Sequence, residues 1–227
     1  MSEAPGRRKS GGGRSARQAL RASETIKVPA YITRQMNPFE VLDEAGLELI
    51  ERNADTILEE VGIDFRDEPE ALAILKAAGA SVDGERVRFP RGMCRQIIQA
   101  SAPATYTQHA RNSERNLEVG GKNTVFAPGY GSPFVRDLDN GRRYATIEDF
   151  QNFVKLAYMS PYMHHSGGTI CEPVDVPVTT RHLDMIYSHI KYSDKAFMGS
   201  VTAPSRAQDT VDMAKIVFGE EFVKNNT

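Results

Sequence analysis

The sequence has 227 residues and a formal net charge of −2, with 40% hydrophobic and 26% charged residues. This length and composition are typical of a globular protein with one large domain, or with one domain and an appendage. The small negative charge argues against a general nucleic-acid-binding protein, and no apolar run is long enough to span a membrane. The two cysteines, Cys94 and Cys171, lie far apart without a partner motif, so we expect no disulfide framework and a reducing, cytoplasmic location.

The first segment, residues 1–25, is basic and contains "RRKSGGGRSAR". It has too little apolar surface to offset the entropy of ordering, so we expect a disordered tail. It also lacks the apolar stretch of a secretory signal. A solvated tail is the simple interpretation, and a tether to an acidic partner is the alternative.

Residues 26–122 are predicted to form an extension of helices and short strands. A helical pattern over residues 37–61 ends at Gly62, and a second helix runs from about Asp67 to Gly79. One face of the first helix is apolar and consists of Leu47, Ile50, Ala54, Ile57, Leu58 and Val61.

A hairpin and a third helix are predicted next in this extension. Asp83 and Gly84 stand between β-type residues, which indicates a tight turn between two strands. Pro90 suits the first turn of a helix. The residues from there to about Gly121 are expected to contain short strands.

From residue 123 to residue 227, strands and helices alternate. The expected strands are "TVFAPG", "YMHHSGGTI" and "KAFMGSV", and each precedes a helix with an apolar stripe. A hairpin with its turn at Asp139 to Gly141 lies between the first strand and its helix. Two helices begin with capping-box patterns, which pair Thr146 with Asp149 and Ser205 with Gln208.

Three strand–helix units at a spacing of roughly thirty residues indicate a parallel sheet with helices outside it. Two α/β architectures fit this pattern, a doubly wound sheet and a (β/α)8 barrel. In both, ligands bind at the carboxyl ends of the strands. We therefore expect "APGYG", "SGGTICEP" and "GSVTAPS" to lie on one rim.

The "GYG" stretch at residues 129–131 does not match a phosphate-binding loop, because its glycines lead to a proline and no Lys follows at the required distance. Instead, Gly129 and Gly131 would let the backbone turn at a strand end and present Tyr130. An exposed tyrosine face can hold a cation. Packing of the ring over the strand top is the alternative.

Glu172 follows the second expected strand, where a carboxylate can neutralise a cationic substrate or transfer a proton. Its alternative is an ion pair with a neighbour, and Asp175 is a weaker candidate of the same kind. Ser200 and Thr202, at the third strand end, can donate hydrogen bonds to a ligand or cap the loop. Cys171 has no histidine tied to it by a motif and is interpreted as a buried thiol.

The histidines do not have the spacing of a metal site. His164 and His165 are adjacent in a strand and therefore face opposite sides, so they cannot easily share a metal. His182 and His189 are expected on the outer helices.

Several stretches resemble a known family both in their residues and in their order along the chain. They are "LELIERNADTILEEVGIDFRDEPEALAILKAAGA", "TVFAPGYGSPFVRDLDNGRRYATIEDF" and "PVDVPVTTRHLDMIYSHIKYSDKAFMGSV". From about Val28 onwards the sequence resembles the trimethylamine methyltransferase (MttB-like) family of corrinoid-dependent methyltransferases. The resemblance implies an α/β fold, namely the N-terminal portion of a (β/α)8 TIM-type barrel preceded by a helical extension with short β elements.

The resemblance also implies a reaction. Such enzymes move a methyl group from a methylated amine, either trimethylamine or a quaternary amine such as glycine betaine, to the cobalt of a separate corrinoid protein. No cofactor is expected to be covalently bound, because the cognate corrinoid protein supplies the cobalamin. The full-length enzyme is expected to be a homo-oligomer. A quaternary amine leaves as a neutral tertiary amine, so no general acid is needed.

The site residues follow from position at the rim. We expect Tyr130, Glu172, Ser200 and Thr202 to contact the substrate, and the glycines to lie against the corrinoid; these glycines are Gly129, Gly131 and Gly168. Catalytic residues are expected in the second half of the barrel. The pyrrolysine position of archaeal trimethylamine enzymes also belongs to that half, which this sequence does not reach.

A complete barrel of this type needs about 250 residues, and only three strand–helix units follow the extension here. The sequence is therefore expected to be an N-terminal fragment that is inactive and poorly soluble by itself. Two other functions remain open. One is an unrelated TIM-barrel enzyme that acts on a phosphorylated small molecule, and the other is a non-catalytic assembly module.

Overall fold

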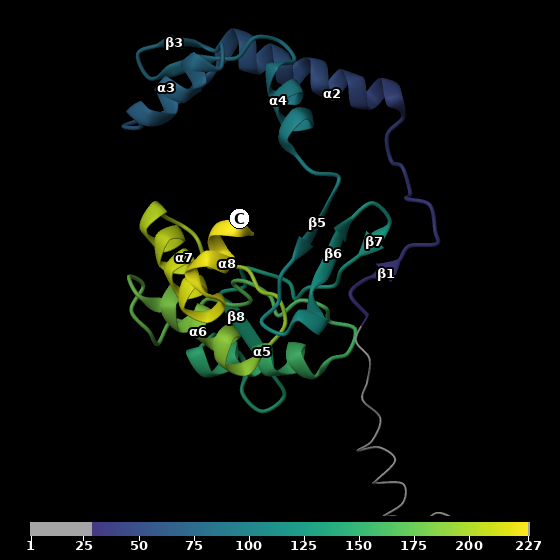
Figure 1. Ribbon diagram of the computed structural model, residues 1–227, viewed down its shortest axis with the longest axis vertical. Coiled ribbons are helices and arrows are strands. Elements are labelled where there is room, and N and C mark those ends of the chain that lie inside the picture. Colours follow the sequence, from purple (N-terminus) through teal and green to yellow (C-terminus); the bar gives the residue numbers. More distant parts are fainter. Residues whose placement is uncertain (1–28, 227) are drawn as a thin grey trace, which may run out of the picture. The chain divides into compact units, whose positions relative to one another are not determined.

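A computed structural model describes residues 29–226 (Figure 1). The predicted disordered tail, residues 1–25, lies outside the described residues. The described chain divides into two compact units, of which residues 34–104 form one and residues 29–33 with 105–226 form the other. The second unit includes the strands between residues 105 and 124, whereas the sequence pattern suggested a division at residue 122.

The unit of residues 34–104 has helices and a small antiparallel sheet, as expected. Its helices are α2 (Glu44–Thr56), α3 (Pro69–Ala77) and α4 (Met93–Ser101), and α2 continues as a π-helical turn over Ile57–Val61. The sheet has the order β2-β4-β3, from Ile63–Asp64, Arg86–Arg88 and Ser81–Asp83. The predicted hairpin with its turn at residues 83–84 is confirmed by the pairing of β3 with β4.

Gly62 ends the first helix with φ 76°, and a Cβ there would lie 2.4 Å from the Val87 carbonyl oxygen. Only glycine therefore fits where the chain passes β4. The prediction for Pro90 was wrong in its detail. Pro90 lies before the helix, because the left-handed Gly92 (φ 77°) is the N-cap of α4 and the first helical residue is Met93.

The core of this unit is small and consists of Ala80, Val87, Phe89 and Met93, with Leu58 and Leu72 packed against it. Most of the predicted apolar face of α2 is exposed; Leu47, Ile50 and Ile57 retain 54%, 56% and 58% of their accessible surface. The periodicity located the helix, but only its last turn reaches the core.

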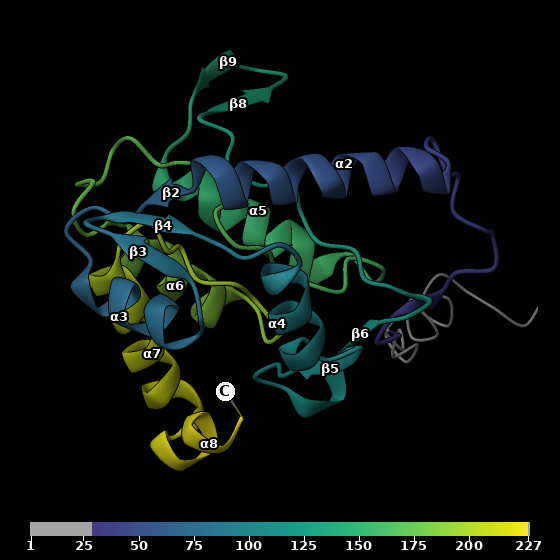
Figure 2. The same cartoon turned by 90° about the horizontal axis from the view of Figure 1, so that it is seen from above.

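The second unit contains three two-stranded antiparallel pairs. They are β1 (Ile32–Thr33) with β7 (Asn123–Thr124), β5 (Thr105–Gln108) with β6 (Leu117–Gly120), and β8 (Phe134–Asp137) with β9 (Gly141–Tyr144). Its helices are α5 (Ile147–Met159), α6 (Arg181–Tyr192), α7 (Pro204–Phe218) and α8 (Glu220–Asn225), and a short 3-10 turn covers Ser113–Arg115. The predicted hairpin is confirmed as β8–β9, which Figure 2 shows projecting from the helices of its unit.

The capping box that opens α5 is confirmed. The Thr146 side chain accepts a hydrogen bond from the Asp149 backbone N–H, and the Asp149 side chain accepts one from the Thr146 backbone N–H. The prediction of a second capping box, between Ser205 and Gln208, was wrong. Ala203 is the N-cap of α7 and Pro204 takes the first helical position, to which its fixed φ is suited, so Ser205 lies inside the first turn. Gln208 donates instead to Asp212 at 2.9 Å.

The sequence pattern of α6 gives an apolar side of Leu183, Ile186, Tyr187 and Ile190, of which only Ile186 is fully buried. His182, Met185 and His189 are each 3% exposed or less, whereas Leu183 and Tyr187 retain 36% and 52% of their surface. His182 and His189 lie on this helix, as expected, and their side chains are buried in the fold. The main core of this unit contains Val135, Phe150, Val154, Ile170 and Met185.

Among the described residues, no helix has both the length and the apolar character needed to cross a membrane.

Candidate functional site

The three segments predicted as strands of the second unit lie side by side, but without regular strand geometry. The first and second are joined by hydrogen bonds from His165 N to Phe126 O (3.1 Å) and from Glu172 N to Ser132 O (3.0 Å). The second and third are joined by bonds from Ser166 N to Ala196 O (2.8 Å) and from Met198 N to Gly167 O (2.9 Å). Gly167 has φ 109°, outside the extended region, and this interrupts the ladder.

The segments run in the same direction and in sequence order, with α5 and α6 between them along the chain. Ser132 and Cys171 form an isolated parallel bridge, and Gly131 N donates to Thr169 O at 2.7 Å. The ends of the first two segments therefore meet, and with the third they form the rim that the sequence predicts. We call residues 129–132, 167–172 and 198–202 the rim loops.

Tyr130 lies across the rim, over Gly168. Its hydroxyl group donates to the Met198 sulfur at 3.6 Å. A Cβ added at Gly168 would lie 3.3 Å from Met198 Cβ and 3.8 Å from the Tyr130 ring. The ring remains 46% exposed, and burial of the rest raises the pKa of Tyr130. The phenol is therefore neutral at physiological pH, and its ring can face a ligand.

Ser200 also lies in the rim, and it accepts a hydrogen bond from Thr169 Oγ1 at 3.0 Å. Thr202 turns towards α7, where Arg206 donates to its hydroxyl group. Glu172 pairs with Arg181 at 3.0 Å, which is the alternative that the sequence left open for this carboxylate. Asp175 accepts from the first backbone N–H group of α5 at 2.8 Å. Any role of these side chains towards a substrate stays a prediction.

The three glycines proposed for the corrinoid differ in their surroundings. Gly131 has φ 79°, which favours glycine, while a Cβ at Gly129 or Gly131 would meet no atom within 4 Å. Gly168 is enclosed by Tyr130 and Met198. The structure brings Tyr130, Gly168 and Ser200 into one rim, and Met198 is the residue of this group that the sequence did not single out.

A buried histidine supports the rim from below. His189 of α6 donates through Nε2 to Gly168 O (3.0 Å), and Ser166 Oγ donates to its Nδ1 (2.7 Å). Burial lowers the pKa of His189 to about 4, so the ring is neutral, as this donor and acceptor arrangement requires. His189 thus fixes the carbonyl group beneath Tyr130.

Lys195 is a buried cation that the sequence analysis did not find. It is 1% exposed, and its Nζ donates to the carbonyl groups of Ala157, Ser160 and Met163 at 2.6–2.8 Å. These carbonyl groups lie at and beyond the carboxyl end of α5, where a positive charge is favoured. Burial lowers the pKa of Lys195 to about 8, which leaves it mainly protonated at neutral pH.

His164 and His165 are both buried, and each accepts a backbone hydrogen bond at Nδ1, from Phe126 and Gly167 respectively, at 2.9 Å. Burial lowers the pKa of both, that of His165 to about 4. Cys171 is also buried, which raises its pKa to about 12, as expected for a thiol without a nucleophilic role. No cluster of metal-ligating side chains occurs among residues 29–226.

Parallel segments in sequence order, connected through helices and ending in a rim of glycine, tyrosine and hydroxyl side chains, define an α/β protein with its candidate site at the segment ends. The chain belongs to the trimethylamine methyltransferase family, whose model matches residues 10–227. The resemblance stated from the sequence is thereby confirmed.

Two relatives are similar to this chain over most of its length. The glycine betaine methyltransferase of Desulfitobacterium hafniense (strain Y51) is 49% identical over 185 residues, which are 82% of this chain and 38% of that protein. The proline betaine:corrinoid methyltransferase of Eubacterium limosum is 28% identical over 179 residues, which are 75% of this chain and 36% of that protein. The chain thus spans less than two fifths of the length of these relatives.

Proposed function

We propose that this chain supplies the first part of a corrinoid-dependent methyltransferase that takes a methyl group from a quaternary amine, with glycine betaine as the leading candidate. The observation that carries this proposal is the 49% identity to a glycine betaine methyltransferase over 82% of the chain. A second relative named for a betaine substrate supports the same class of amine. Trimethylamine, after which the family is named, is the second candidate.

The proposal includes the fold of the complete enzyme, a (β/α)8 barrel preceded by the helical extension. Support comes from the three extended segments, which follow one another in space in sequence order. Helices connect them, as in the strand–helix units of such a barrel. The further units would come from sequence beyond residue 227.

Tyr130 is the proposed contact for the substrate cation. A quaternary ammonium group can neither donate nor accept a hydrogen bond, and its positive charge is spread over its methyl groups. An aromatic face is therefore a suitable partner for it. The half-exposed Tyr130 ring, fixed by Met198 and Gly168, offers such a face. No proton has to move, because the leaving amine is neutral. The chain therefore acts by binding and orienting the methyl group.

The corrinoid belongs to a partner protein in this proposal, and its cobalt supplies the nucleophile that accepts the methyl group. The rim residues fit that role better than they fit a resident cofactor. The histidines near the rim, His164, His165 and His189, are buried and use at least one ring nitrogen within the fold. The backbone at Gly129 and Gly131 is open to an approaching surface, since a Cβ there would meet no neighbour.

The test compares two substitutions of Tyr130 in a family-length enzyme that carries this sequence. Tyr130→Ala removes the ring and should weaken glycine betaine binding by about tenfold or more, whereas Tyr130→Phe keeps the ring and should change it less than about threefold. Tyr162→Ala is the matched control, because Tyr162 is 64% exposed and is the first residue of the second segment, at the end opposite to the rim. Isothermal titration calorimetry measures the binding.

Equal and small effects of the two Tyr130 variants would assign the tyrosine to packing alone. The reaction itself is tested separately by following methyl transfer from glycine betaine to free cob(I)alamin. If trimethylamine serves and glycine betaine does not, the substrate assignment is wrong. If neither amine is demethylated, the proposed reaction is wrong.

A further inference from the structure

The β8–β9 hairpin rises from the rim of the candidate site. Its first strand begins two residues after Ser132, which bridges to Cys171 at the end of the second segment. Its base is closed by bonds from Ala145 N to Pro133 O (3.2 Å) and from Val174 N to Ala145 O (2.9 Å). The hairpin is thus attached to the loops that hold Tyr130 and Glu172, and it projects from the helices of its unit (Figure 2).

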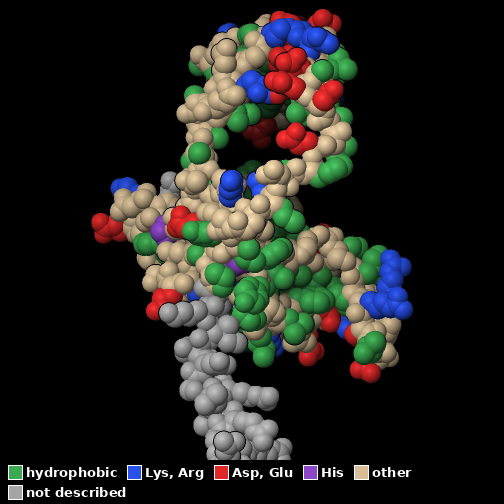
Figure 3. All heavy atoms as spheres, turned by 90° about the vertical axis from the view of Figure 1, so that its right-hand side faces the viewer, with side chains coloured by type: hydrophobic (Ala, Val, Ile, Leu, Met, Phe, Trp, Pro, Cys, Tyr) green, Lys and Arg blue, Asp and Glu red, His purple; other side chains and the backbone are tan. Residues whose placement is uncertain are grey.

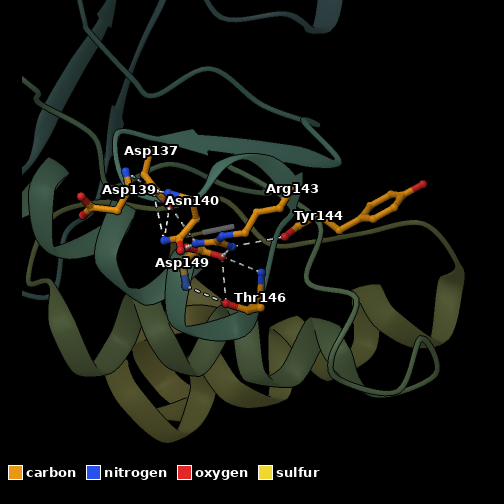
Figure 4. A network of polar contacts seen from close by, with 7 residues as sticks. All are labelled: Asp137, Asp139, Asn140, Arg143, Tyr144, Thr146 and Asp149. Atoms are coloured by element: carbon orange, nitrogen blue, oxygen red, sulfur yellow. Dashed lines mark hydrogen bonds and ion pairs between the residues drawn. The ribbon is translucent and has the colours of Figure 1, made fainter.

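The inner face of the hairpin is anchored to α5. Arg143 forms ion pairs with Asp149 and with Asp137, and Asp149 also caps the helix (Figure 4). Val135, directly opposite Arg143 in the ladder, is buried in the core. The hairpin is therefore held in one orientation.

The outer face is defined by the register of the two strands. Phe134 pairs with Tyr144, and Arg136 pairs with Arg142, so these four side chains share one face. We call them the hairpin outer face. The two aromatic rings lie 4.7 Å apart, and the Arg142 guanidinium lies 3.8 Å from the Phe134 ring centre.

The charge on this face is not compensated within the described part of the chain. Arg136 and Arg142 stand directly opposite each other, both are exposed, and neither forms an ion pair with residues 29–226. Like charges at paired positions of a ladder are destabilising. Figure 3 shows the hairpin at the right of the view, with basic side chains along it. The hydrophobic neighbours Leu138 and Tyr144 are 104% and 58% exposed.

We propose that the hairpin outer face is the surface on which the corrinoid protein docks, through carboxylates that pair with Arg136 and Arg142. The identity of the partner rests on the proposed function. Guanidinium groups bind carboxylates in a two-pronged geometry, and arginine and aromatic side chains are enriched in the centres of protein interfaces. Only residues 131–133 separate Tyr130 from the first strand of the hairpin, so a partner held there is attached to the loop that carries this tyrosine.

The same charges argue against a second copy of the chain as the occupant. In a two-fold symmetric contact the same patch meets itself, which would bring arginines against arginines. A partner with an acidic surface removes the repulsion between the two arginines and also binds faster through electrostatic attraction.

The experiment uses a family-length enzyme that carries this sequence, with Arg136→Glu, Arg142→Glu and the double variant. The methyl acceptor is either the cognate corrinoid protein or free cob(I)alamin. Each single variant should raise the KM for the corrinoid protein by about tenfold or more, and the double variant should raise it further. Transfer to free cob(I)alamin should stay within about twofold. Raising the salt concentration should weaken binding of the unmodified enzyme more than that of the double variant.

Lys122→Glu is the charge control. It makes the same change of two charge units on an exposed residue in the turn between β6 and β7, and it should leave both rates unchanged. The melting temperature checks the fold, and it should not fall in Arg136→Glu, which sets opposite charges across the ladder.

Unchanged KM values for the corrinoid protein in the double variant would overturn the docking proposal. So would an equal loss in the Lys122→Glu control, because that result indicates a general charge effect. A changed oligomeric state with an unchanged KM would assign the face to a second copy, against the proposal. Absence of transfer to free cob(I)alamin in the unmodified enzyme is a different result, because it contradicts the reaction and not the docking surface.

Discussion

The two units of the chain bury different kinds of side chain. In residues 34–104 the buried core is apolar and small, built on Ala80, Val87, Phe89 and Met93. In the second unit the interior also holds histidines, serines and a lysine. The buried polar residues of the described chain all belong to this unit; they are His164, His165, Ser166, His182, Ser188, His189, Ser193, Lys195 and Ser200.

Burial of polar groups costs free energy unless they are hydrogen-bonded. The second unit meets this cost through internal bonds, such as those of His189 to Ser166 and Gly168 and those of Lys195 to three carbonyl groups. Such networks fix one arrangement of the backbone. The contrast indicates that the second unit uses polar burial to hold its rim in a defined geometry, whereas the buried side chains of the first unit are apolar and its ion pairs, such as Arg86 with Asp64, lie at the surface.

The largest difference between the two units should be in how their stability responds to low pH. The pKa values of His165 and His189 are lowered to about 4 by burial, from an ordinary value of 6.5. Below pH 6.5 the unfolded state takes up protons that the folded state does not, so the free energy of unfolding falls until about pH 4. The loss is up to about 3 kcal/mol for each histidine.

Hydrogen exchange followed by mass spectrometry reports on each unit separately. Between pH 6.5 and pH 4, protection corrected for intrinsic exchange should decrease in α5 and α6 and change little in α3 and β4. Replacement of His189 by Gln should remove about half of the pH dependence. Equal loss of protection in both units would contradict the assignment to buried histidines.

Removal of the buried cation should have the next largest effect. Lys195→Met leaves three carbonyl groups without their donor and should lower the free energy of unfolding by about 3 kcal/mol or more. Lys191→Met is the control, because Lys191 lies exposed on the last turn of α6 and should cost no more than about 0.5 kcal/mol. Denaturation in urea, followed by circular dichroism, measures both. Equal costs would mean that the carbonyl groups find other donors.

In the unit of residues 34–104, a buried and an exposed apolar side chain can be compared. Val87 is fully buried, and Val87→Ala should cost about 2 kcal/mol, whereas Ile50→Ala on the exposed face of α2 should cost no more than about 0.5 kcal/mol. The same urea denaturation compares the two variants. A similar cost for both would show that the face of α2 is covered in the protein as it exists in solution.

The smallest effect is expected at the start of α5. Asp149→Asn weakens the capping box and the pair with Arg143, and should cost about 1–2 kcal/mol. Arg143 holds the pKa of Asp149 well below its ordinary value, so this contribution is present above about pH 4 and is lost as the pH falls further. Glu148→Gln, next to it and exposed, should change the melting temperature little. A thermal melt at pH 7 that does not distinguish the two variants would contradict the role of the box.

Much of the local structure could be predicted, because its signals lie within a few residues of one another. The turns at Asp83–Gly84 and at residues 139–141, and the pairing of Thr146 with Asp149, depend on neighbours in the sequence. The capping box at Ser205 was wrong because Pro204 competes for the same turn. Periodicity placed most of the helices to within a few residues, but the first begins at Glu44 and not at residue 37, and α8 was not predicted.

The buried face of α6 could not be predicted, because it depends on partners distant in the sequence. Apolar periodicity favoured Leu183, Ile186, Tyr187 and Ile190, and it found Ile186 but not the histidines. His189 is hydrogen-bonded to a carbonyl group 21 residues away, and His182 to a carboxylate 27 residues away. The histidines do share the i, i+3, i+4 and i+7 positions with Met185 and Ile186, and that spacing was the available signal. Lys195 gave no local signal, since its three acceptors lie 32–38 residues earlier.

If the rim binds the amine as proposed, its glycines set the limits for any library that aims to change the substrate. Gly168 cannot be varied freely, because a Cβ there would lie 3.3 Å from Met198 Cβ and already in contact with the Tyr130 ring at 3.8 Å. Gly131 has a backbone conformation that other residues rarely adopt. Gly129 has neither restriction, so randomising this single codon should yield folded variants with new side chains at the position before Tyr130.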